Sequence, residues 1–164
     1  DGAALLLLAS KEAIEKYQLP ILGRIVATKW AGVDPAEMGL GPVYATNALL
    51  KSCHLEMTDI DYWEINEAFA AQVLACVAAW KSDEYCQQNL DRDHAVGTLD
   101  MAKLNIDGGA IALGHPVGAS GARIVLHLAH VLQRKKAHLG IATLCIGGGQ
   151  GGALLLENTA KGEV

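Results

Sequence analysis

The feature that most constrains the fold is a pair of apolar runs joined by glycines near the C-terminal end of the sequence. Residues 139–146 and 153–157 are rich in aliphatic side chains that do not alternate with polar ones, which is typical of strands buried on both faces. Between them, residues 147–152 contain five glycines, a composition typical of a connection that turns sharply. The sequence therefore predicts two consecutive strands inside a sheet that other elements cover.

Strand and helix patterns alternate along the rest of the chain. Further strands are predicted at residues 1–9, 21–30 and 60–65, and an apolar, glycine-containing segment that should pass through the core at residues 105–113. Helices are predicted at residues 10–17, 43–54, 66–80 and 118–136. Residues 81–103 are polar and weakly periodic, which indicates a surface excursion with a short helix near residues 83–90. We therefore expect an α/β fold in which helices flank both faces of a mixed five-stranded sheet.

Length, charge and cysteine spacing exclude several classes of protein. The 164 residues suffice for one domain, and the formal net charge of −5 argues against nucleic-acid binding, which depends on Lys and Arg. The apolar stretch at residues 3–9 is too short to span a membrane and lacks the basic region of a signal peptide, so we expect a cytoplasmic protein. The four cysteines form no C-x-x-C pair and have no histidine at zinc-ligand spacing, so we expect no metal site.

Three short segments place a polar or reactive side chain where a predicted buried strand ends, which is where α/β folds gather their ligands. They are Asn66-Glu67-Ala68-Phe69-Ala70, Gly114-His115-Pro116 and Cys145-Ile146-Gly147-Gly148-Gly149. Each also has a purely structural explanation. Asn66 could cap the helix that follows, His115 could be a satisfied loop histidine, and Cys145 could be an inert buried thiol. No single segment decides between structure and chemistry.

The three segments taken in order closely resemble the C-terminal half of the thiolase family. The resemblance rests on residues 66–70, on residues 105–123 (N-x-x-G-G-A-I-A-x-G-H-P-x-G-A-S-G-A-R) and on residues 145–151 (C-I-G-G-G-Q-G), with support from Gly32-Val33-Asp34-Pro35 and Gly41-Pro42. It implies a thiolase-type half with the five-stranded sheet given above. It also implies that residues 17–164 are the C-terminal thiolase domain, and that residues 1–16 are the last strand and linker of a missing N-terminal half.

The resemblance implies a role for each of four residues. Cys145 matches the cysteine that acts as acid and base on the α-carbon of acetyl-CoA, and the free pKa of a thiol suits such a role. His115 matches the histidine that activates the nucleophilic cysteine and donates a hydrogen bond to a thioester oxygen. Asn66 matches the asparagine that holds a water beside the enolate oxygen. The backbone N–H of Gly147 matches one donor of the second oxyanion hole.

As a whole, the resemblance implies an acyl-CoA C-acyltransferase that catalyses reversible Claisen condensation and thiolysis between acetyl-CoA and 3-ketoacyl-CoA. Coenzyme A thioesters are then substrates, and no cofactor is expected. The expected partners are these acyl-CoA substrates, the chain's own N-terminal domain and further copies in a homodimer or homotetramer, without nucleic acid or membrane. Because the family's nucleophilic cysteine has no counterpart here, we expect the chain alone to be inactive. Asn66 and Ile146-Gly147 favour the acetyl-CoA acetyltransferase side of the family.

Two other functions fit parts of the sequence. A phosphate- or nucleotide-binding module could use residues 147–152, but these lack the Lys-Ser/Thr of a P-loop and no predicted helix follows them. A condensing enzyme of the ketoacyl-synthase type shares the fold but uses two histidines, so Cys145 in the third motif argues against it.

Overall fold

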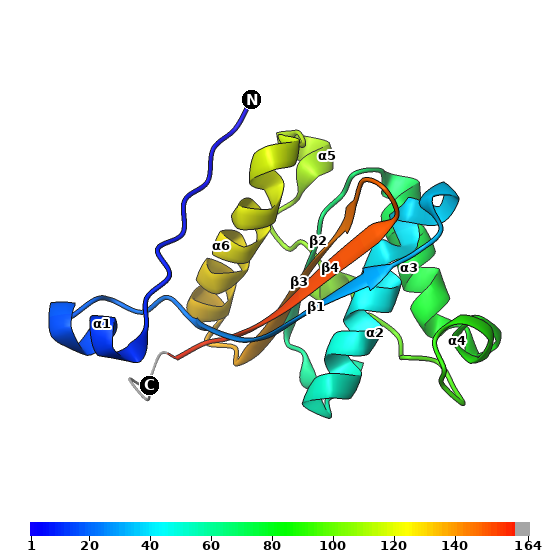
Figure 1. Cartoon of the computed structure of the whole chain (residues 1–164), viewed down its shortest axis with the longest axis horizontal. Helices are drawn as coiled ribbons and strands as arrows, with labels where there is room; N and C mark the ends of the chain where they lie inside the picture. The colour runs from blue at the N-terminus through cyan, green and yellow to red at the C-terminus, as the bar shows by residue number, and fades with distance from the viewer. Residues whose placement is uncertain (160–164) are drawn as a thin grey trace.

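The computed structural model describes residues 1–159, which build a mixed sheet with helices on both of its faces (Figure 1). The strands are β1 (Arg24–Gly32), β2 (Tyr62–Ile65), β3 (Leu139–Ile146) and β4 (Gln150–Glu157). The α-helices are α1 (Lys11–Tyr17), α2 (Gly41–Cys53), α3 (Ala70–Lys81), α4 (Asp83–Asn89), α5 (Ala110–Leu113) and α6 (Val117–Lys135). Short 3₁₀ helices occur at Pro35–Leu40, Met57–Asp59 and Met101–Lys103. The α/β class predicted from the sequence is therefore confirmed.

The sheet has the strand order β1-β4-β3-β2, and only the pair β2–β3 is parallel. β3 and β4 form the predicted hairpin, but its turn is only three residues long because Gln150 already pairs with Ile146. Gly148 and Gly149 in this turn have φ of 86° and 83°, a conformation that glycine adopts without the penalty of a Cβ atom. The glycine run thus divides into a turn and the first residues of β4.

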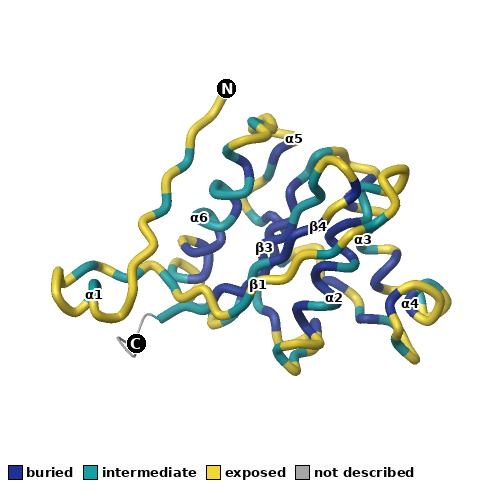
Figure 2. Tube along the Cα trace, in the orientation of Figure 1, coloured by how far each residue is buried: buried dark blue, intermediate teal, exposed yellow. Residues whose placement is uncertain are grey.

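Helix α6 covers one face of the sheet, and α2 and α3 cover the other (Figure 1). Side chains of β3 alternate between the two layers, because successive residues of a strand point to opposite faces. Ile141 joins the larger core under α2 and α3, and Ala142 joins the smaller core under α6. β3 is therefore buried on both faces along most of its length, as its continuous apolar run predicts (Figure 2).

The described residues form four strands, so the expected number of five is wrong. The predicted strand that is not formed is residues 1–9. Beside β2, a single parallel bridge joins Trp63 to Leu104. Asn105 then has a φ of 44°, which ends the extended backbone. Its side chain continues the pairing instead, since Oδ1 accepts a hydrogen bond from the N–H of Ile65 and Nδ2 donates one to the C=O of Ile65, both at 2.9 Å.

Replacing Asn105 by glycine is expected to destabilise the chain by about 2–4 kcal/mol, measured as the free energy of unfolding in urea. Glycine tolerates the positive φ, so the loss comes from the buried N–H and C=O of Ile65, which lose their partners at about 1–3 kcal/mol each. His54→Gly is the matched control, because His54 is exposed with a φ of 55°. That control should be neutral or slightly stabilising. Equal losses in the two variants would contradict the role given to the Asn105 amide.

Residues 1–9 are extended but belong to no strand, contrary to the sequence-based expectation. Leu5, Leu7 and Leu8 are exposed at 89%, 81% and 73% (Figure 2). An extended segment needs a neighbouring strand for its backbone hydrogen bonds, and none of the described residues provides one. Helix α1 follows, with the Oγ of Ser10 accepting a hydrogen bond from the N–H of Ala13, as a cap should. No helix within residues 1–159 is long and apolar enough to cross a membrane.

Three other segments differ from the sequence-based expectations. Residues 81–103 contain the predicted short helix, α4, but are more than a surface excursion, because Cys86, Leu90 and Leu99 are buried in the larger core. Residues 105–113 do not cross the core: they form a turn and α5, with Ile111 and Leu113 exposed. The helix predicted from residue 66 begins at Ala70, so residues 66–69 form a loop that leaves the sheet.

Candidate active site

Asn66 and Cys145 lie at the same edge of the sheet, where the two parallel strands end. Asn66 directly follows β2, and Cys145 is the last residue but one of β3. Ile65 at the end of β2 is paired with Thr143 of β3, and the N–H of Asn66 donates to the C=O of Thr143 at 3.0 Å. Cys145 lies two residues further along β3, opposite Gly151 of β4. The sequence-based expectation that the two residues share one edge is therefore met by the backbone.

His115 reaches the same edge from the loop between α5 and α6, and it contacts Asn66. The Oγ of buried Ser120 donates to the C=O of Pro116 at 3.2 Å, so toward the His115 Nδ1, at 2.7 Å, it acts as an acceptor. Nδ1 therefore carries the ring proton, and Nε2 is left as a hydrogen-bond acceptor. The Nδ2 of Asn66 lies 3.4 Å from this Nε2 and donates to it. Asn66 does not cap α3, whose N-cap is Phe69.

The amide oxygen of Asn66 is buried and has no hydrogen-bond partner among the described residues. Asn66 itself is 1% exposed, so Oδ1 has lost access to bulk water. Burying a polar atom without a partner costs about 1–3 kcal/mol, so such an atom calls for a donor such as an ordered water. Asn66 also lines a small cavity of about 80 Å³ next to Gly109 and His127, which is large enough for water molecules.

Cys145 is half-buried, and no hydrogen bond joins its Sγ to Asn66 or His115 among the described residues. Its side chain follows the face of Ile141 and Thr143, since alternate residues of a strand share a face, so it points toward α2 and α3. Burial raises the pKa of the Cys145 thiol, opposed by a backbone hydrogen bond. At neutral pH the group is therefore a thiol, able to donate a proton to a developing negative charge.

Gly147 is the first residue of the β3–β4 turn, and the space around its Cα atom is open. A Cβ atom built there would have no heavy atom within 4 Å. The other end of the turn is fixed, because the N–H of Val33 donates to the C=O of Gly149 at 2.8 Å. A ligand can thus approach the backbone of Gly147 closely at a turn that the rest of the fold holds in place.

The other cysteines have the surroundings of structural thiols. Cys76 donates to the C=O of Gly39 at 3.3 Å, and burial raises the pKa of its thiol to about 12, with a further contribution from the nearby Cys145. Cys86 donates to the C=O of Ala79 at 3.4 Å within the core. In the part of the chain that the structure describes, no three side chains of His, Cys, Asp or Glu are grouped as metal ligands.

The family model of the thiolase C-terminal domain matches residues 19–158, which is most of the chain. This chain belongs to the thiolase family. The thiolase domain is 44% identical to the mitochondrial 3-ketoacyl-CoA thiolase of Rattus norvegicus over 160 residues, which cover 98% of this chain and 36% of that protein. It is 47% identical to an acetyl-CoA acetyltransferase of Escherichia coli (strain K12) over 157 residues, covering 96% of this chain and 36% of that protein.

Solved structures agree with these relatives. The crystal structure of human mitochondrial 3-ketoacyl-CoA thiolase superimposes with a TM-score of 0.77 at 43% identity, over 92% of this chain and 34% of that one. The same human protein in complex with CoA gives the same values. The thiolase domain thus spans about a third of the length of the proteins it matches. The glycine run also forms a strand–turn–strand hairpin here, so the P-loop alternative is wrong.

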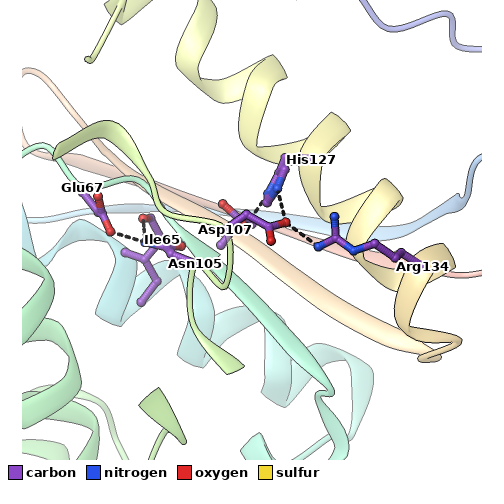
Figure 3. Close-up of polar contacts among 7 residues, drawn as sticks. Ile65, Glu67, Asn105, Asp107, His127 and Arg134 are labelled. Carbon is purple, nitrogen blue, oxygen red and sulfur yellow. Dashed lines mark hydrogen bonds and ion pairs between the residues drawn. The ribbon is translucent and has the colours of Figure 1, made fainter. Parts of the chain in front are cut away.

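Beside the candidate site, the thiolase domain carries a chain of polar contacts that begins at buried Glu64 and ends at the surface. Figure 3 shows its outer members, His127, Asp107 and Arg134. The carboxylate of Glu64 lies 2.7 Å from the Nδ1 of His127, and the Nε2 of His127 lies 3.0 Å from Asp107. Asp107 also forms an ion pair with Arg134 on α6. These contacts join β2, α6 and the loop of residues 105–109 in one network. Glu64 is its buried end, and Arg134 lies at the surface.

Glu64 is expected to make the stability of the thiolase domain depend on pH. The pKa of its carboxyl is raised from 4.5 to about 7, mainly by burial. His127 lowers this pKa, and the charges of Asp107 and Glu67 add to the rise. Because the folded-state pKa is the higher one, the protonated form stabilises the fold below about pH 4.5, and this contribution is lost as the pH rises through about 7.

In urea unfolding, the stability of the wild type relative to Glu64→Gln should therefore fall between about pH 4.5 and 7 and level off above. A difference that rises with pH over this interval would contradict the assignment.

Sequence reasoning missed two residues of the site. Ser120 lies inside the second motif, but only the structure shows that it fixes the His115 tautomer. Glu67 stands next to Asn66 in the first motif, and nothing in its spacing indicated that it contacts residues 105 and 111. Ser120 contacts His115, five positions away, and Glu67 contacts Ile111, 44 positions away. No local sequence pattern encodes either contact.

Proposed function

We propose that this chain is the C-terminal part of an acyl-CoA C-acyltransferase that catalyses reversible Claisen condensation and thiolysis between acetyl-CoA and 3-ketoacyl-CoA. The observation that carries the proposal is the contact between Asn66 and His115, at the edge of the sheet where Cys145 lies near the end of β3. An N-terminal half supplies the nucleophilic cysteine, and residues 1–16 belong with that half while residues 17–164 form the C-terminal domain. Coenzyme A thioesters are its substrates.

His115 serves the first half-reaction through its unprotonated Nε2. With Nδ1–H bonded to Ser120, Nε2 accepts the proton of the nucleophilic thiol, and the thiolate attacks the acyl carbonyl carbon. The bond from this carbon to the sulfur of coenzyme A then breaks, and coenzyme A leaves as its thiolate. The protonated Nε2–H then points a donor toward the thioester oxygen, where negative charge develops. Ser120 keeps the ring in this orientation throughout, since its own hydroxyl proton is held by Pro116.

Cys145 and Asn66 serve the second half-reaction. In the synthetic direction the thiolate form of Cys145 removes a proton from the α-carbon of acetyl-CoA and becomes the thiol, and in the degradative direction the thiol protonates the leaving enolate. The buried and unpartnered Oδ1 of Asn66 accepts a hydrogen bond from a water, whose other proton faces the enolate oxygen. The N–H of Gly147 is one donor of the second oxyanion hole, and the open space at its Cα atom supports this role.

Exposed apolar side chains surround the site and support the docking of an N-terminal half. Phe69, Ile111, Leu113 and Val117 are exposed at 69%, 63%, 67% and 79%. Apolar groups gathered at one edge, next to residues with catalytic chemistry, are typical of a surface that another domain covers. The unpaired segment of residues 1–9 points to the same partner, because it lacks a neighbouring strand here.

The remaining properties are proposals of the same kind. Asn66 and Ile146-Gly147 favour a short acyl chain, as in an acetyl-CoA acetyltransferase. We expect the longer protein to be a homodimer or homotetramer. The cytoplasmic location stays a prediction, since mammalian relatives are named as mitochondrial and bacterial relatives are not.

The proposal is tested with the longer protein that carries this chain and with residues 1–164 alone. The longer protein should convert acetoacetyl-CoA and CoA into acetyl-CoA, and a comparison of short and long 3-ketoacyl-CoAs should give its chain-length preference. Residues 1–164 alone should give no turnover. Absence of cleavage of every 3-ketoacyl-CoA by the longer protein would refute the proposed function, and turnover by residues 1–164 would refute the need for another half.

A further inference from the structure

The carboxylate of Glu67 lies against the loop of residues 105–111, and Figure 3 shows its contact with Asn105. Its Oε1 accepts a hydrogen bond from the Nδ2 of Asn105 at 2.9 Å, and its Oε2 accepts one from the N–H of Ile111 at 3.0 Å. Gly109 lies against the same group, since a Cβ atom there would be 2.6 Å from the Cδ of Glu67. A side chain at position 109 would therefore push the Glu67 carboxylate away from its two donors.

These bonds connect the two residues that meet in the site. Glu67 directly follows Asn66 in the chain. Ile111 is the second residue of α5, whose N-cap, Gly109, has no side chain to satisfy the first N–H groups of the helix. α5 ends at Leu113, and two residues later the chain reaches His115. The position of His115 relative to Asn66 therefore depends on how Glu67 holds the start of α5.

We infer that Glu67 is a positioning residue that sets the separation of the Asn66 Nδ2 and the His115 Nε2, 3.4 Å in the structure. The inference rests on the proposed function for its effect on turnover, but the geometry stands apart from it. Glu67 touches neither the Asn66 amide nor the His115 ring. It acts through Asn105 and through the backbone of α5.

Glutamine cannot replace this carboxylate, although it has the same shape. Both partners of Glu67 are donors, so the NH₂ group of a glutamine must face one of them. The Asn105 amide cannot rotate to offer its oxygen, because that would break its two hydrogen bonds to Ile65. The N–H of Ile111 has no alternative orientation. Glu67→Gln therefore places donor against donor and displaces one end of the loop.

The test compares Glu67→Gln and Glu67→Ala with Asp61→Ala in the longer protein. Asp61 is the matched control because its Oδ2 also accepts two backbone N–H bonds, from His138 at 2.7 Å and Leu139 at 3.0 Å, at the opposite end of β2. Misplacing a reacting group by about 1 Å costs on the order of 100-fold in rate, so both Glu67 variants should lower kcat about 10- to 100-fold with little change in KM. Asp61→Ala should lower the urea midpoint by a similar amount and leave kcat within about twofold of wild type.

The outcomes separate a positioning role from a structural one. Glu67 variants that keep kcat within twofold, or an Asp61 variant that loses as much kcat at equal stability, would overturn the inference. A crystal structure of the Glu67→Gln protein supplies a readout that needs no activity: the Asn66–His115 separation should increase, or residues 109–115 should take two conformations. An unchanged separation would overturn the inference even if the wild type were inactive, whereas an inactive wild type with a displaced loop would refute only the proposed function.

Discussion

Cys145→Ala in the longer protein is expected to lower the rate of condensation by about 10²–10⁴-fold, the usual contribution of a general acid–base group. Formation of the acyl-enzyme should be nearly unchanged, because only the second half-reaction moves a proton at the α-carbon. The raised pKa of the Cys145 thiol suits the reverse, degradative direction, in which the thiol gives its proton to the leaving enolate. Mass spectrometry after mixing with acyl-CoA measures acylation, and product formation measures condensation.

Cys53→Ala is the control for the cysteine experiment. Cys53 is also half-buried, and it ends α2 with only a weak contact to the Oγ of Ser52 at 3.8 Å. This variant should behave as the wild type in both measurements. If Cys145→Ala lost acylation as strongly as condensation, the role proposed for Cys145 would be wrong.

His115→Ala is expected to lower both half-reactions, each by about 10²–10⁴-fold. Acylation fails because no neutral Nε2 takes the proton of the nucleophile, and condensation fails because the donor to the thioester oxygen is lost. The same two assays separate this pattern from that of Cys145→Ala. His130→Ala is the control, since His130 is an exposed residue of α6. Acylation at the wild-type rate in His115→Ala would exclude His115 as the activating base.

A smaller and different change is expected for Ser120→Ala. It leaves the His115 ring in place but removes the oxygen that fixes the proton on Nδ1. Since the tautomer is then no longer set by a partner, we expect a partial loss of acylation, below that of His115→Ala. Retention of full acylation would show that other groups fix the tautomer.

Strong local patterns made much of the fold predictable. The continuous apolar run of β3 and the helical spacing of α2 and α6 gave element bounds that the structure matches within about two residues. The sheet edge was not predictable in the same way. The fifth strand was expected at residues 1–9, which pair with no strand among the described residues. At β2 the side chain of Asn105 bonds Ile65, and no local pattern distinguishes such an amide from one that faces solvent.

The site was predictable as far as its motifs. Asn66 and His115 are in contact and Cys145 lies at the same edge, although 30 to 79 positions separate the three in the chain. Their chemical roles stay predictions until the variants are measured. Ser120 and Glu67 could not be singled out, because their importance lies in which distant atoms they meet. Residues 81–103 were predicted to be a surface excursion because they are polar and weakly periodic, but Cys86, Leu90 and Leu99 within them reach the core.

The side-chain pairing at β2 also governs how this sheet meets other molecules. An edge strand with unpaired N–H and C=O groups can pair with a strand of another molecule, which is a common route to aggregation. At the edge strand β2, Ile65 has both of these groups bonded to the Asn105 amide. The C=O of Trp63 accepts a hydrogen bond from the N–H of Asn105. β1 at the other border pairs only with β4 among the described residues. Strand addition between copies would therefore begin at β1, the edge of the sheet opposite β2, and would not cover Asn66 and His115.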